Sequence, residues 1–232
     1  MTQDVAVIVG VGKGLSASLA RLFHGEGMAV ALAARKSERM AELCGALPGA
    51  KGYVCDASDA ASVAGLFEAV ERDLSTPSLV VFNAGMRGRG PVAELDVEQV
   101  RVGLMNGAFA GFLVGQQAAR RMLPKGRGSI LFTGATASVK GFAQSAPFAM
   151  AKFALRGLAQ SMARELAPQG LHVAHIVIDG GIATTYSKDA ADRATDRWLD
   201  PDAIAQTYLQ LHRQHRSTWT WEVEVRPWVE KF

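Results

Sequence analysis

The 232-residue sequence is poor in the residues that form metal centres and disulfide bonds. Its two cysteines, Cys44 and Cys55, have neither the Cys-x-x-Cys spacing nor the spacing of metal ligands. Two buried free thiols are the simplest interpretation, so we expect no metal site. With no sign of a disulfide framework, a reducing cytoplasm is the expected location.

Long apolar segments are also missing. No run approaches the roughly 18 apolar residues that a bilayer-spanning helix requires. The first four residues lead directly into a strand-like run and lack the basic region of a signal peptide. The sequence therefore predicts no membrane association and no signal peptide.

A strong excess of charge of one sign is absent. The formal net charge is +3, and the arginines form only small groups, such as Arg87 with Arg89, without interleaved aromatic residues. A nucleic-acid-binding surface needs a denser basic stripe, so solvated arginines are the simpler interpretation and no nucleic-acid partner is expected. The positive sign still suits a ligand that carries phosphate.

The sequence does contain an alternation of short apolar runs with longer amphipathic ones. The short runs predict buried strands at residues 5–9, 29–33, 79–82, 129–132 and 173–178, with a weaker candidate at 52–55. The amphipathic segments predict helices at 15–26, 37–46, 58–74, 97–122 and 148–167. Such βα units imply a parallel sheet covered by helices on both faces. We therefore predict one α/β domain over residues 1–232, with a doubly wound parallel sheet of about seven strands.

The tail, residues 218–232, has a different pattern. Trp219, Trp221, Val223 and Val225 alternate with polar residues, which predicts a final strand with one apolar face. The two tryptophans on that face either cover the core or meet another subunit.

A glycine-rich segment follows the first predicted strand and opens the first predicted helix. Gly10, Gly12 and Gly14 would let the backbone turn tightly and approach a pyrophosphate, whose charge the helix N-terminus then stabilises. A plain structural turn is the alternative. The position between strand and helix favours a dinucleotide site.

The residues after the second predicted strand bear on the choice of nucleotide. NAD-binding proteins of this kind have an acidic residue there, whereas this chain has Arg35 followed by Lys36. Arg35 could bind a 2′-phosphate in bidentate fashion, and Lys13 could add charge from the glycine-rich turn. The alternative is that both are solvated side chains. The sequence thus favours NADP(H) over NAD(H).

Together these motifs resemble the short-chain dehydrogenase/reductase family, over nearly the whole chain. The family's turn, Thr-Gly-x-x-x-Gly-x-Gly, corresponds to residues 9–16, where Val9 and Ser16 depart from it. Ser16 adds a small side chain where helix and strand pack closely, which is expected to shift the loop slightly. The resemblance implies a single-domain Rossmann fold that binds a nicotinamide nucleotide.

The resemblance implies further cofactor contacts after later strands. Asp56-Ala57 matches the aspartate that contacts adenine, and Asn83-Ala84-Gly85 matches the family's Asn-Ala-Gly, for which an ordinary β-turn is the alternative. Residues 179–184 correspond to the segment whose threonine holds the nicotinamide amide. The turn and the resemblance together place these residues at the cofactor: Gly10, Gly12, Lys13, Gly14, Leu15, Arg35, Asp56, Ala57, Asn83, Ala84, Gly85, Lys152, Gly180, Ile182 and Thr184.

The catalytic positions that the resemblance implies are only half retained. Asn106 and Lys152 match the family's asparagine and lysine, whereas Phe148 stands at the tyrosine position and Ala135 at the serine position. The sequence resembles an atypical subgroup with the same Phe for Tyr, the lysine kept and an imperfect glycine motif.

The two replacements remove both catalytic hydroxyls. A phenol titrates near pH 10, and a neighbouring lysine ammonium brings it toward working pH, which makes tyrosine a useful acid. Phe148 has no proton to give, and Ala135 cannot hydrogen-bond a substrate oxygen. Lys152 keeps a separate role in the family, binding the nicotinamide ribose hydroxyls; a helix-surface lysine is the alternative.

Another group would then have to supply the proton. Asp179 replaces the family's proline beside the nicotinamide, and a desolvated carboxyl can hold a proton near neutral pH, although a turn-capping aspartate is the simpler interpretation. The weaker candidates are Ser138, Ser145, Tyr186, His172 and His175.

Two functions remain open. The first is an NADP(H)-dependent oxidoreductase whose small-molecule substrate, such as an iminium or a polarised alkene, accepts hydride without a tyrosine. The second is an inactive NADP(H)-binding sensor or oligomer partner, with lyase or isomerase chemistry a distant third. Residues 184–200 are long enough for a substrate lid, which favours the enzyme. The helices around Asn106 and Phe148 resemble the family's oligomer surfaces, so we expect a homodimer or homotetramer.

Overall fold

A computed structural model describes residues 3–183 and 195–230. Its central sheet has the order β3-β2-β1-β4-β5-β6-β9, and all of its neighbouring strands pair in parallel. The strands are β1 (Val5–Val9), β2 (Ala29–Ala34), β3 (Lys51–Val54), β4 (Leu79–Phe82), β5 (Gly128–Thr133), β6 (Leu171–Ile178) and β9 (Glu222–Val225). The prediction of a doubly wound parallel sheet of about seven strands is confirmed, and the fold is a single-domain Rossmann fold.

The strand order reverses between β1 and β4, which pair although two βα units separate them in the chain. In such sheets the connections leave a crevice beyond the carboxyl ends of the strands at this switch point. The turn after β1 and the segment after β4 both open into it, so the topology places these two motifs together.

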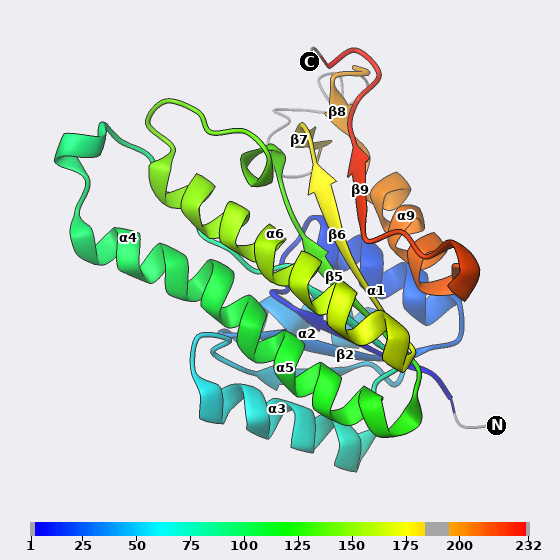
Figure 1. Cartoon of the computed structure of the whole chain (residues 1–232). Helices are drawn as coiled ribbons and strands as arrows, with labels where there is room; N and C mark the ends of the chain where they lie inside the picture. Colours follow the sequence, from blue (N-terminus) through cyan, green and yellow to red (C-terminus); the bar gives the residue numbers. More distant parts are fainter. Residues whose placement is uncertain (1–2, 184–194, 231–232) are drawn as a thin grey trace.

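Helices cover both faces of the sheet (Figure 1). One apolar core lies between the sheet and α1 (Leu15–Gly25), α2 (Glu38–Ala46) and α9 (Pro201–Arg213). The other lies between the sheet and α3 (Ala60–Asp73), α5 (Ala110–Met122) and α6 (Ala146–Leu166). The inner strands β1, β2, β4, β5 and β6 are buried on both sides, which explains their continuous apolar sequences.

Residues 97–122 form one long helical segment, as predicted, but it is not uniform. α4 (Val97–Leu104) passes into a π-helical turn, Met105–Phe109, before α5 begins (Figure 1). Its close contact with α6 depends on Gly107, where an added Cβ would lie 2.8 Å from the Cβ of Ala151. A π-helical turn inside an α-helix often marks a functional site.

Several observed elements are not among the predicted ones. Helix α9 is missing from the prediction although Asp200 caps it and Pro201 occupies its first turn. Two short strands, β7 (Gly181–Ile182) and β8 (Trp198–Leu199), pair with each other beside the main sheet. The short 3-10 turns are η1 (Val92–Glu94), η3 (Leu123–Lys125), η4 (Thr136–Ser138), η5 (Ala167–Gln169) and η6 (Arg216–Thr218).

The predicted shared face of the C-terminal strand is wrong. Strand β9 begins only at Glu222, and Val223 packs on the core beneath α1 and α9. Trp221 packs on the opposite core and lies 5.6 Å from the Arg156 guanidinium, while Trp219 stacks on His172 at 5.0 Å. Alternation therefore does not extend through the tryptophans, because they precede the strand.

No helix in the described parts of the chain is long and apolar enough to cross a bilayer.

Candidate active site

A cleft of about 440 Å³ lies at the carboxyl ends of the strands. Most of the residues that the sequence analysis places at a cofactor or catalytic position line it. They are Gly10, Gly12, Gly14, Leu15, Arg35, Asp56, Ala57, Asn83, Ala84, Gly85, Asn106, Ala135, Phe148, Lys152, Gly180 and Ile182. Lys13 and Asp179 are absent from the lining, and Thr184 and Tyr186 lie outside the described residues. The topology therefore brings together residues from nearly the whole chain.

The glycine-rich turn makes one wall of the cleft. Gly10 has a φ of +97°, and an added Cβ would lie only 2.6 Å from the backbone nitrogen of Ala84. Only glycine allows this combination of left-handed backbone and close approach. Gly14 provides no side-chain cap for α1, so the first N–H groups of the helix remain available to an anion at this end of the cleft.

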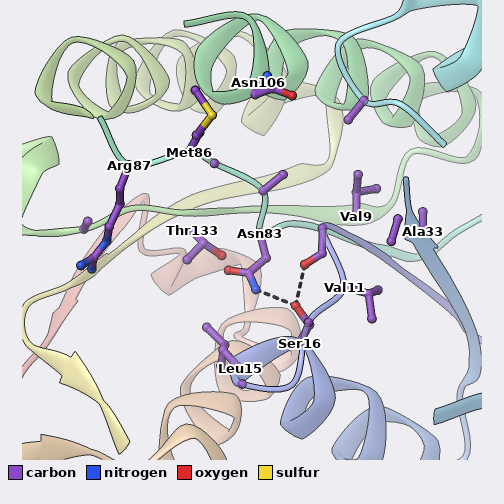
Figure 2. Close-up of a pocket in the computed structure, with 18 of the residues that line it drawn as sticks. Val9, Val11, Leu15, Ser16, Ala33, Asn83, Met86, Arg87, Asn106 and Thr133 are labelled. Carbon is purple, nitrogen blue, oxygen red and sulfur yellow. Dashed lines mark hydrogen bonds between the residues drawn. The ribbon is translucent and has the colours of Figure 1, made fainter. Parts of the chain in front are cut away.

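Ser16, which departs from the family's glycine motif, has a structural role. Its hydroxyl donates to the Gly10 carbonyl at 2.8 Å and accepts from Asn83 Nδ2 at 2.7 Å (Figure 2). Asn83 also donates its backbone N–H to Val9. The serine thus ties the glycine-rich turn to the segment after β4.

The ends of β2 and β3 form the far part of the cleft. Asp56 accepts hydrogen bonds from the Ser58 hydroxyl at 2.7 Å and the Ser58 N–H at 2.9 Å. These bonds, with a smaller contribution from Arg35, lower the pKa of Asp56, so its carboxylate is ionised and fixed in orientation.

Two arginines line this part of the cleft. Arg35 was predicted here, whereas Arg39 was not. Arg39 lies four residues further on, in the first turn of α2, and this helical spacing could have identified it. Lys13, the other predicted cation, is exposed outside the lining.

Lys152 lies at the opposite end of the cleft. Its side chain is 7% exposed, and Nζ donates to the Thr133 carbonyl at 2.8 Å. Burial, together with the positive charge of Arg87, lowers its pKa to about 8. Lys152 is thus a buried pocket residue and not the surface lysine that the sequence left as an alternative.

Two cations lie close to the Phe148 ring. The Arg87 guanidinium lies 5.5 Å and the Lys152 ammonium 5.9 Å from the ring centroid. Ala135 lines the same region and donates its backbone N–H to the Ser138 hydroxyl at 3.1 Å. Ser138 is fully buried in this contact, so it does not replace the missing serine hydroxyl.

Asn106 lies in the π-helical turn and lines the cleft. Its Nδ2 donates to the Val102 carbonyl at 2.9 Å, within the preceding helix. The side-chain oxygen is thereby oriented, because the amide nitrogen is engaged.

The contacts of Asp179 do not support a role as proton donor. Its carboxylate accepts a hydrogen bond from the Thr136 hydroxyl and pairs with Arg226 at 3.3 Å. The carboxylate is thus engaged by two partners, and the side chain does not line the cleft. Asp179 links the loop after β5 to the C-terminal tail.

The two histidine candidates also lie outside the lining. His172 contacts the Thr220 carbonyl at 2.9 Å, and the Nδ1 of His175 lies 3.1 Å from Glu222. Both rings are buried at the edge of the sheet. They belong to the core, the interpretation that the sequence favoured over catalysis.

Sequence reasoning missed three residues at the Lys152 end of the cleft: Met86, Arg87 and Thr133. Met86 and Arg87 directly follow Asn83-Ala84-Gly85, with Met86 extending toward the helix that carries Asn106 (Figure 2). Their place beyond β4, at the switch point, was a usable signal. The Thr133 hydroxyl hydrogen-bonds to the buried Tyr208 hydroxyl at 2.8 Å. No local sequence pattern indicates this contact, because the two residues are distant in the chain.

Comparison with known proteins identifies the family. The model of the short chain dehydrogenase family matches residues 4–195, most of the chain. This protein therefore belongs to the short-chain dehydrogenase family. Carbonyl reductase family member 4 from Danio rerio is 27% identical over 215 residues, covering 89% of this chain and 90% of that protein.

Solved structures agree with this assignment. A short-chain dehydrogenase from Rhodopseudomonas palustris is 34% identical with a TM-score of 0.85, covering 97% of this chain and 99% of that one. A metagenomic short-chain oxidoreductase in complex with NADP is 25% identical with a TM-score of 0.82, covering 98% of each chain.

Proposed function

We propose that this protein is an NADP(H)-dependent oxidoreductase that works without the tyrosine and serine hydroxyls of its family. The observation that carries the proposal is the cleft itself, which joins an uncapped helix N-terminus behind Gly10 to the buried ammonium of Lys152. The cleft fits a dinucleotide, because its glycine-rich wall accommodates pyrophosphate and its ends offer separate polar contacts.

The phosphorylated nucleotide is favoured by charge. Arg35 and Arg39 line the cleft beyond β2, where a carboxylate would repel a 2′-phosphate. Guanidinium groups bind phosphate oxygens in a planar, bidentate geometry. In the same region, Asp56 and Ala57 are placed to contact the adenine.

The residues that line the cleft would have separate roles in binding and reaction. The bound cofactor would supply hydride. Lys152 would bind the ribose hydroxyls of the cofactor. Asn83 and Asn106 would provide polar contacts in the lining of the cleft. Phe148 presents an apolar face and has no proton to transfer, and Ala135 leaves room where a serine would hold the substrate oxygen. Losing general acid help typically costs about 10²–10⁴-fold in rate, so the substrate should be one that accepts hydride readily, such as a polarised alkene or an imine.

We also propose that the protein is a homodimer or homotetramer. Phe109, Phe112, Met150 and Phe153 are each exposed by 40% or more on the helical segments around Asn106 and Phe148. The Phe109 and Phe112 rings stack on each other at 6.3 Å. Exposed apolar side chains grouped in this way are typical of interaction surfaces.

The test combines binding with turnover. Calorimetry should show NADPH binding, and Arg35→Gln should weaken NADPH by about tenfold while leaving NADH within about twofold, because only NADPH carries the 2′-phosphate. NADPH oxidation would then be followed against enones, imines and ketones. Absence of binding to either reduced nucleotide would refute the proposal. Tight binding with no turnover on any substrate would indicate the inactive sensor instead.

A further inference from the structure

The Lys152 end of the cleft has a distinct charge. Its two ionisable lining residues are Arg87 and Lys152, and none of its described lining residues is acidic. Asp56, the acidic residue of the lining, follows β3, three strands away from β4 in the sheet. At about 4.8 Å per strand, it lies roughly 14 Å from the β4 end.

The two cations converge on one place. Both lie within 6 Å of the Phe148 centroid, so a group beside this ring would meet both of them. Lys152 is buried, and its ammonium is held by the Thr133 carbonyl. Arg87 is exposed on the segment after β4, so its guanidinium can reach a ligand that enters the cleft. A guanidinium has the planar fork that matches a carboxylate.

We infer that the substrate carries a carboxylate near its reducible bond and that Arg87 is the residue that binds it. This inference rests on the proposed function, because the cofactor must occupy the glycine-rich side of the same cleft. A carboxylate fits a pocket whose walls, Met86, Phe148 and Ile182, are otherwise apolar, since its charge is then met by Arg87.

The positive charges of Arg87 and Lys152 also restrict the chemical classes of substrate that could accept hydride in this pocket. An iminium is cationic, so Arg87 and Lys152 would repel it at close range. A neutral carbonyl or a polarised alkene carries no such penalty, and the nearby cations stabilise the negative charge that develops when it accepts hydride. Acids that contain such a bond are therefore the favoured substrate class, and cationic imines are disfavoured.

The test uses the protein saturated with NADP⁺ and three ring compounds of similar shape. Benzoate is anionic, benzamide neutral and benzylamine cationic, and calorimetry measures the binding of each. We expect benzoate to bind at least tenfold more tightly than benzamide and benzylamine not to bind. Arg87→Gln should weaken benzoate at least tenfold without changing NADP⁺ binding.

Arg89→Gln provides the matched control. Arg89 is an exposed arginine two residues further along the same segment, outside the lining, so its replacement should change benzoate binding by less than twofold. Equal benzoate binding by Arg87→Gln and the unaltered protein would overturn the inference, as would benzoate binding that is undetectable or no tighter than benzamide binding. Failure of NADP⁺ to bind at all would instead refute the proposed function.

Discussion

At the scale of single residues, the proposed function depends on Phe148 and Ala135 standing where the family resemblance implies two hydroxyls. Phe148 provides an aromatic ring with the Arg87 and Lys152 cations within 6 Å of its centroid, and it has no transferable proton. Lys152 retains the position from which an ammonium would activate a phenol, and its Nζ is already fixed by the Thr133 carbonyl. On the proposed function, a phenol at position 148 would therefore find an ammonium already held nearby.

This geometry predicts a gain of function. The double variant Phe148→Tyr, Ala135→Ser should reduce a simple ketone with NADPH at least tenfold faster than the unaltered protein, because it restores a general acid beside Lys152. Initial rates of NADPH oxidation measure the gain. Adding Lys152→Met should remove it, since the phenol then loses the ammonium that lowers its pKa. A double variant that binds NADPH but shows no gain would contradict this account of the site.

At the scale of secondary-structure elements, the contact between the segment 97–122 and α6 positions Asn106 and Lys152 on one cleft. At Gly107 an added Cβ would lie 2.8 Å from the Cβ of Ala151, which precedes Lys152 in the chain. The Cβ of alanine cannot rotate away, so any side chain at 107 must push the helices apart. The small residue therefore helps to set the distance between Asn106 and Lys152.

Two glycine-to-alanine substitutions should act in opposite directions. Gly107→Ala should lower the free energy of unfolding by about 1–3 kcal/mol through overpacking against Ala151. Gly157→Ala, on the exposed side of α6 with open space around its Cβ, should raise that free energy by up to about 1 kcal/mol through helix propensity. Urea unfolding measures both changes. Stabilisation by Gly107→Ala would show that the helices separate without cost.

The observed elements also show which parts of the fold local sequence patterns can predict. Strands β1 to β6 are predicted within one or two residues at each end, because most of them are buried and form continuous apolar runs bounded by turns, whereas β9 begins only at Glu222. The prediction missed helix α9, although its capping residues and the helical spacing of Ile204, Tyr208 and Leu211 are both present in the sequence. The π-helical turn at Asn106 depends on packing against α6, which no local pattern records.

At the scale of the whole molecule, distant segments are joined by a partly buried polar network at the sheet edge. Glu222 of β9 accepts two hydrogen bonds from Arg156 of α6, at 2.6 and 2.7 Å, and lies 3.1 Å from His175 of β6. His175 is fully buried, and the burial lowers its pKa from 6.5 to about 4. The C-terminal strand is thus held to the sheet by a network that depends on protonation.

This network predicts acid sensitivity. Because the folded-state pKa of His175 lies below its unfolded value, the unfolded chain takes up a proton first as pH falls. The stability due to the neutral ring is then lost between about pH 6.5 and 4, by up to about 3 kcal/mol. Urea unfolding at pH 7 and pH 5 should show a smaller loss for His175→Asn than for the unaltered protein. The exposed His215→Asn serves as the control, and identical losses in all three proteins would contradict the assignment.

The sequence by itself determined the α/β class, the parallel sheet and the family, because these follow from periodicity and from motifs a few residues long. It also placed Gly10, Asn83, Asn106 and Lys152 at one cleft, since all follow the carboxyl ends of strands or face them. Only the tertiary structure decided that Asp179 pairs with Arg226 and that Arg87 shares the Phe148 ring with Lys152. The Asp179–Arg226 and Arg87–Phe148 contacts join residues far apart in the chain, and the geometry of such contacts depends on the packing of the whole fold.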